Sequence, residues 1–133
     1  MKRQVKEWLR RAEVDLLSAE KLLDDEFLTQ SVAFHAHQVI EKSLKDILEN
    51  SERKIPKIHD LEKLYGLVEE AGIEIDIDED MLAQINDVYI DTRYPGDVGL
   101  IQEGKPSIKK VKSFYELAKK IYQKVVKIII EDQ

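Results

Sequence analysis

Apolar residues recur every three or four positions near the start of the chain. One face of a helix repeats about every 3.6 residues, whereas a strand alternates every two, so the spacing predicts an amphipathic helix over residues 3–24. The acidic run Asp24, Asp25 and Glu26 then interrupts the pattern. The apolar positions of this first helix are Val5, Leu9, Ala12, Leu16, Ala19 and Leu23.

A second helix is predicted over about residues 29–50, and it is apolar around more of its circumference. We therefore expect it at the centre of the fold. A third helix begins near Asp60, a suitable N-cap, and ends at Gly72. Residues 73–78 alternate like a strand, but no second strand is available, so an extended loop is the better interpretation.

A fourth helix is predicted over residues 79–91, followed by a loop from Thr92 to Pro106 that contains several Gly and Pro residues. Ser107 can cap the last helix. The inward positions of this helix again step by three and four: Val111, Phe114, Ala118, Ile121, Val125 and Ile128. The pattern predicts one all-α domain over residues 1–133, an antiparallel bundle of four to five helices.

Composition narrows the class of protein. Hydrophobic residues make up 43% and charged residues 36% of the chain, which is typical of a globular domain and leans toward a heat-adapted host. The chain has no cysteine, so neither disulfides nor thiolate metal sites are expected. No apolar run is long enough for a membrane span or a signal peptide, which predicts a cytoplasmic protein. A net charge of −6 argues against a dedicated nucleic-acid coat protein.

Four polar residues interrupt the apolar second helix: Gln38, Glu41, Lys42 and Lys45. Their spacing places them on one stripe of the helix. One interpretation is a solvated face that carries a Glu41–Lys45 pair. The other is a polar face that lines a groove or a dimer interface.

The sequence Arg93-Tyr94-Pro95 stands where the fourth helix is expected to end. Arg offers a fork of donors suited to phosphate, and Tyr offers a face on which a base can stack. The alternative is that Arg93 caps the last carbonyls of the helix while Tyr94 packs on the core.

The histidines do not form a metal site by spacing. His35 and His37 point about 200° apart around one helix, and the HExxH pattern that would make His37 and Glu41 a zinc pair is absent. Asp15 lies at the border of the first helix's apolar stripe. It either faces solvent or pairs with a Lys or Arg across the bundle.

Four short segments together resemble the HEPN domains (higher eukaryotes and prokaryotes nucleotide-binding). Residues 12–20 (AEVDLLSAE) resemble the first-helix signature and residues 33–45 (AFHAHQVIEKSLK) the second. Residues 59–61 (HDL) resemble the opening of the third helix, and residues 93–95 (RYP) the arginine motif that ends the fourth. The segments come in the family's order and cover nearly the whole chain.

The resemblance implies a helical bundle that dimerises and a separate small nucleotidyltransferase as partner, in a pair that can act as a toxin–antitoxin system. Many HEPN domains are metal-independent endoribonucleases whose active site pairs an Arg with a His a few residues later. Here no His follows His59, so that route is in doubt, unless the fold brings one of the three histidines beside Arg93.

A non-nucleolytic branch of the family is the remaining interpretation. It implies a nucleotide or RNA ligand, no cofactor and no catalytic residue. The candidate binding residues are Arg93, Tyr94, Lys42, Lys45, Glu41, Gln38 and Asp15, with Asp60 as a further motif position. The alternatives are a ribonuclease toxin with a non-standard base and a non-catalytic dimeric scaffold.

Overall fold

The computed structural model is all-α, as predicted, and it describes residues 1–93 and 105–133, with the backbone alone for residues 90–93. Its helices are α1 (Arg3–Leu22), α2 (Thr29–Asn50), α3 (Leu61–Glu70), α4 (Glu79–Arg93) and α5 (Ile108–Glu131), with a short 3₁₀ helix, η1 (Glu26–Leu28), between the first two. The described residues contain no strand.

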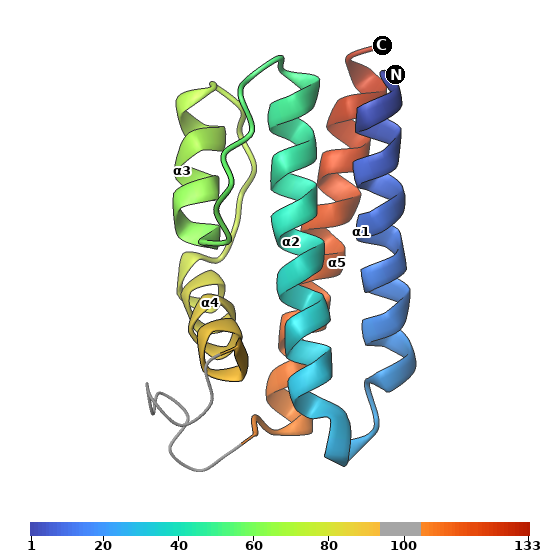
Figure 1. Ribbon diagram of the computed structural model, residues 1–133, viewed down its shortest axis with the longest axis vertical. Helices are drawn as coiled ribbons and strands as arrows, with labels where there is room; N and C mark the ends of the chain where they lie inside the picture. Colours follow the sequence, from blue (N-terminus) through green and yellow to red (C-terminus); the bar gives the residue numbers. More distant parts are fainter. Residues whose placement is uncertain (94–104) are drawn as a thin grey trace.

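The three long helices lie side by side, with α3 and α4 on the other side of α2 (Figure 1). α1 runs antiparallel to both α2 and α5, while α2 and α5 point the same way. The hydrogen bond from Tyr122 to Glu13 joins α5 to α1, and the one from Asn50 to Asp132 joins the ends of α2 and α5. α2 packs against every other helix, so its expected central place is confirmed.

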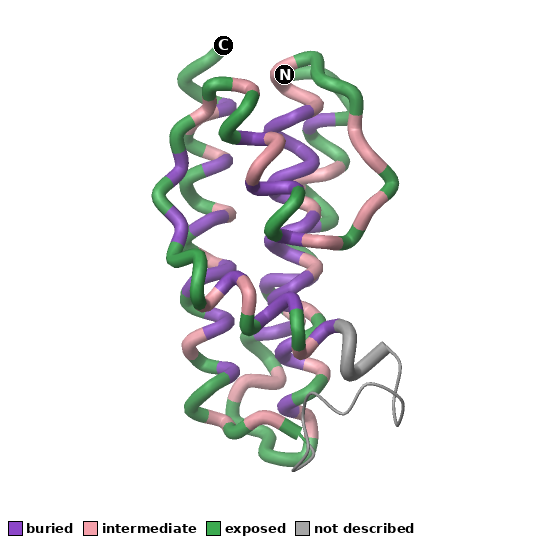
Figure 2. The backbone as a smooth tube through the Cα atoms, turned by 90° about the vertical axis from the view of Figure 1, so that its left-hand side faces the viewer, coloured by how far each residue is buried: buried purple, intermediate pink, exposed green. Residues whose placement is uncertain are grey.

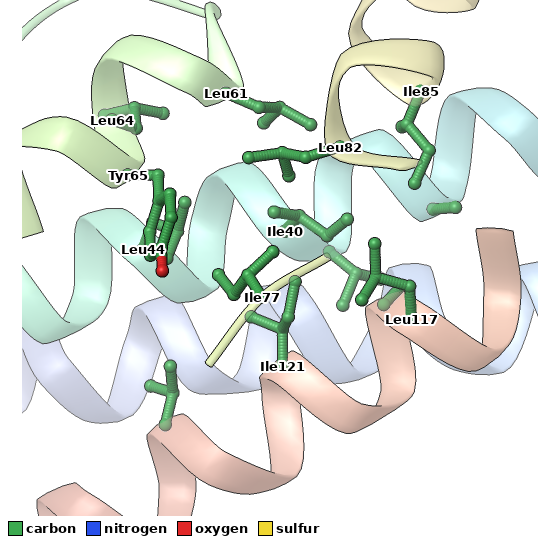
Figure 3. Packing of buried hydrophobic residues seen from close by; sticks show 14 of the residues in the cluster. Ile40, Leu44, Leu61, Leu64, Tyr65, Ile77, Leu82, Ile85, Leu117 and Ile121 are labelled. Atoms are coloured by element: carbon green, nitrogen blue, oxygen red, sulfur yellow. The ribbon is translucent and has the colours of Figure 1, made fainter. Parts of the chain in front are cut away.

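One hydrophobic core fills the space around α2 (Figure 3). Ile40 and Leu44 of α2 lie at its centre, and every α-helix contributes buried residues. The segment 73–78 forms no strand, as expected. Its alternation instead sends Ile75 and Ile77 into the core, while Glu74 and Asp76 remain exposed (Figure 2).

The predicted helix ends are mostly confirmed. Asp60 accepts hydrogen bonds from the backbone N–H groups of Glu62 and Lys63, and the Ser107 hydroxyl accepts one from that of Lys110. Gly72 follows α3 with φ of +79°, a left-handed conformation that Gly adopts without a Cβ clash.

Two predicted bounds were wrong. The first helix ends at Leu22 rather than residue 24, and α4 continues to Arg93, so Thr92 and Arg93 are helical rather than part of a loop. Residues 94–104 of the predicted loop, including Tyr94, lie outside the described residues. Within the part of the chain that the structure describes, no helix combines the length and hydrophobicity that a membrane span requires.

Candidate functional site

The polar residues of α2 are not a solvated face. Glu41 and Lys45 are only 5% and 6% exposed, so the interpretation of a freely solvated Glu41–Lys45 pair was wrong. The pair itself is present, with Lys45 Nζ 2.9 Å from Glu41 Oε2. It is covered because His59, in the connection between α2 and α3, folds back onto Glu41. Both charges are therefore held in fixed positions by hydrogen bonds.

Glu41 is the centre of a polar network that joins α2 to the connection between α2 and α3. Its carboxylate lies 3.0 Å from Nδ1 of His59 and 3.7 Å from Nδ1 of His37. A buried carboxylate is tolerated only when it is paired and hydrogen-bonded, and here Lys45 and His59 supply that stabilisation. Half of the His59 side chain remains exposed, whereas His37 is fully buried. His59 is thus the member of the network that a ligand can reach.

The His37 side chain packs against α4. Its ring stacks on Tyr89 with centroids 3.8 Å apart and an interplanar angle of 11°. Phe34, 40% exposed despite its place on the apolar helix, stacks on Tyr89 as well, with centroids 6.0 Å apart. Burial lowers the pKa of His37 to about 4, opposed by the Glu41 carboxylate and by the polar groups of His59 and Asn86. The imidazole is therefore neutral at physiological pH.

A second ion-pair cluster joins α2 to α1. Lys42 Nζ donates to Asp15 at 2.5 Å, and His35 Nδ1 lies 2.8 Å from the other oxygen of Asp15. The prediction that Asp15 pairs with a cation across the bundle is confirmed. Burial alone raises the pKa of Asp15, but the hydrogen bonds from His35 and Lys42 outweigh it, so the pKa lies below its usual value. Asp15 is therefore a carboxylate that fixes Lys42 in place.

The structure brings the predicted site residues into two neighbouring groups rather than one. Lys42 belongs with Asp15, and Lys45 belongs with Glu41. Gln38 lies on the same helix, half-buried, one turn before Lys42. Arg93 is the last residue of α4, and its side chain lies outside the described part.

Two of the three histidines lie against the helix that ends at Arg93. Arg93 follows Tyr89 by one helical turn, so the two positions share a face of that helix. His37 and His59 both lie against Tyr89, the latter with ring centroids 6.1 Å apart. His35 belongs instead to the Asp15 cluster. Two histidines are thus near the α4 face that ends at Arg93.

The sequence did not indicate that His59 and Tyr89 contact the polar residues of α2. The i, i+4 spacing of His37 and Glu41 was the available signal for half of the network. Nothing in the pattern indicates that His59, in an irregular connection, returns to α2. Within residues 1–89 and 105–133, whose side chains the structure describes, no three acidic, His or Cys side chains are grouped so as to hold a metal ion.

Two solved structures have the same fold. TT1696 from Thermus thermophilus superposes with a TM-score of 0.74 at 23% identity, covering 95% of this chain and 98% of that one. ST0689, described as an archaeal HEPN homologue, gives a TM-score of 0.68 at 21% identity, covering 97% and 99%. A search of curated proteins gives no significant match. The HEPN domain family model matches residues 5–129, and with this match over nearly the whole length the chain belongs to the HEPN domain family.

Proposed function

We propose that this chain is a HEPN-type accessory module that binds a nucleotide on the α2 face and acts with a separate small nucleotidyltransferase. Family membership over residues 5–129 supports the class of protein. Function within a fold depends on its site, so the polar clusters of α2 must carry the rest of the proposal.

The observation that carries the proposal is the pair of cations fixed on α2. Lys42 is held by Asp15 and Lys45 by Glu41, so neither side chain has to lose much rotamer freedom when an anion binds. The Lys42 side chain keeps 23% of its surface exposed, which leaves donor positions for a phosphate oxygen. In this proposal Lys42 and Arg93 hold the phosphates, while Glu41 and Asp15 orient the cations.

Calorimetric titration of ATP, with and without magnesium, tests the site. We expect saturable heat in the wild type and a loss of about 10-fold or more in affinity for Arg93→Ala, since a charge-assisted hydrogen bond contributes about 1.5–3 kcal/mol. Arg53→Ala is the matched control, because Arg53 is an exposed arginine outside both clusters. Absence of heat from the wild type at millimolar ATP would contradict the proposed site.

The partner is tested separately. We expect a gene for a small nucleotidyltransferase next to that of this chain, and a stable complex when the two purified proteins are mixed and analysed by size-exclusion chromatography. The proposal includes a homodimer formed through the helices. If Glu41→Ala or Lys42→Ala dissociates the dimer while ATP binding is unchanged, the protein is instead a scaffold whose polar stripe is a subunit interface.

A second candidate function is a ribonuclease with a non-standard base. It is favoured by His59, whose Nδ1 is held by Glu41 and which lies against Tyr89, one turn before Arg93. A carboxylate-bound imidazole is oriented to accept a proton through Nε2. RNA degradation that disappears in both Arg93→Ala and His59→Ala, but not in His35→Ala, would establish this activity. An inert wild type would exclude it.

A further inference from the structure

A cleft of about 600 Å³ opens beside the Glu41 network. Its floor is the end of α2 at Lys45 and Glu49, one wall is the first half of α1, and the other is the connection between α2 and α3. Figure 2 shows this connection standing away from the helices before it returns to α3. The volume is within the range of small-molecule sites, roughly 300–1,000 Å³.

One aromatic side chain lies in the lining of the cleft. Trp8, the only tryptophan of the chain, lines it from α1 and is partly exposed. Ile55 and Pro56 line it from the connection. An indole and apolar side chains in one cleft suit a planar ring, because stacking of a base on an aromatic residue contributes about 1–3 kcal/mol. This part of the lining therefore favours a ligand that contains a ring.

Cations line the same cleft. Lys57 is exposed and has no ion pair within residues 1–93 and 105–133. Arg11 lies 3.3 Å from Glu7, but Glu7 is held more closely by Arg10 at 2.7 Å. Lys45 adds a third cation, already bound to Glu41. Because Glu7 and Glu49 are also in the lining and Lys45 is balanced by Glu41, Lys57 is the cation best placed for a ligand, which suits one anionic group better than a chain of them.

His59 completes the lining. Its Nδ1 is 3.0 Å from Glu41 Oε1, and since a carboxylate accepts, this nitrogen carries the proton. Nε2 is then the ring nitrogen left for a ligand, on a side chain that is half exposed at the cleft. The Glu41 contact fixes the ring orientation, so this hydrogen-bonding position is preformed.

We propose that this cleft binds the ring of a nucleoside monophosphate, with the base stacked on Trp8 and the single phosphate at Lys57 and Arg11. This rests on the proposed nucleotide-binding function and places a monophosphate in a cleft toward the C-terminal half of α2, lined by neither Lys42 nor Arg93. His59 Nε2 binds a ribose hydroxyl or a base edge. The ligand class follows from the combination of a partly exposed indole and one exposed lysine, Lys57, in the same cleft.

Trp8 reports on the cleft directly, because its fluorescence has no competing tryptophan. AMP is expected to quench it saturably, while ribose 5-phosphate, which lacks the ring, leaves it unchanged. Adenosine, which lacks the anion, is expected to bind about 10-fold more weakly. Lys57→Ala should weaken AMP binding by about 3- to 10-fold, whereas Lys54→Ala, an exposed lysine of the same connection outside the cleft, should stay within about 2-fold.

Calorimetry with Trp8→Ala distinguishes failure of this proposal from failure of the ATP site. Loss of AMP binding in Trp8→Ala supports the cleft. ATP binding that is retained in Trp8→Ala and lost in Arg93→Ala, with no quenching by AMP, overturns the cleft and leaves the proposed function standing. No quenching by AMP and no heat with ATP overturns both. If Trp8→Ala does not fold, AMP quenching of Trp8 fluorescence in Lys57→Ala is compared with that in Lys54→Ala. Weaker AMP binding in Lys57→Ala alone supports the cleft, and equal binding in the two variants overturns it.

Discussion

Asp46 is a buried carboxyl group that nothing in the described structure pairs. It lies on α2 with 0% of its surface exposed, and neither of its oxygens has a hydrogen-bond partner among the described residues. Burial, together with the charge of Glu49, raises the pKa of Asp46 to about 8. Tyr122 lies close enough for Asp46 to contribute to raising its pKa as well. At neutral pH Asp46 is therefore protonated in the folded protein.

The substitution Asp46→Asn keeps the shape and removes the titration. In the unfolded chain the carboxyl ionises near its ordinary value of 3.8, so the folded state binds the proton more tightly. Stability is greatest where both states are protonated and falls as pH rises from about 4 to about 8. One unit of pKa is about 1.4 kcal/mol, which sets an upper bound of about 6 kcal/mol. Relaxation and water penetration reduce the expected loss to about 2–3 kcal/mol.

Urea unfolding followed by far-ultraviolet circular dichroism measures this loss. Between about pH 5 and pH 8 the free energy of unfolding of the wild type should fall by about 2 kcal/mol more than that of Asp46→Asn. Asp76→Asn is the control, because Asp76 is exposed and should follow the wild type. If the difference between wild type and Asp46→Asn stays constant across this range, Asp46 is ionised in the folded protein and the reasoning fails.

Three further experiments test the buried histidine, the Asp15 cluster and the α3 cap. As pH falls from about 6.5 to 4, the free energy of unfolding of the wild type should fall by about 2–3 kcal/mol, because the buried imidazole resists the proton that the unfolded chain accepts. His37→Phe should abolish this fall. Acid unfolding curves of equal slope for the two proteins would count against it. Lys42→Met should lower the free energy of urea unfolding by about 2 kcal/mol, because the Asp15 carboxylate loses its lysine partner. Adding Asp15→Asn should recover part of this loss. Additive losses in the double variant would argue against coupling between Asp15 and Lys42. Asp60→Ala should cost about 1–2 kcal/mol in thermal unfolding by removing the α3 cap, and an unchanged melting temperature would contradict that role.

The helices were predictable from the sequence because each apolar stripe repeats with the period of a helix over many residues. The central place of α2 followed from its unusually apolar surface, and the caps Asp60 and Ser107 from their side-chain chemistry. Helix ends depend on a few local hydrogen bonds, which periodicity does not encode. For this reason α4 extends past its predicted end.

The sequence identified candidate residues for the site but not how those residues are buried and paired. The spacing of Glu41 and Lys45 gave their pairing but not their burial, because the segment that covers them is irregular and carries no periodic signal. The partner of Asp15 lies on another helix, so neither the pairing with Lys42 nor that with His35 has a local signature. Whether Arg93 contacts phosphate or caps α4 stays a prediction, since its side chain lies outside the described residues.

The central position of α2 has a consequence for the exchange of backbone amide hydrogens with solvent. Because α2 packs against all four other helices, exposing its amides requires those interfaces to separate together. Its slowest amides should therefore exchange only through global unfolding, with protection that matches the full free energy of unfolding. α3 has far less helix surface to release, so its amides should exchange through smaller openings that leave the α1–α2–α5 group intact.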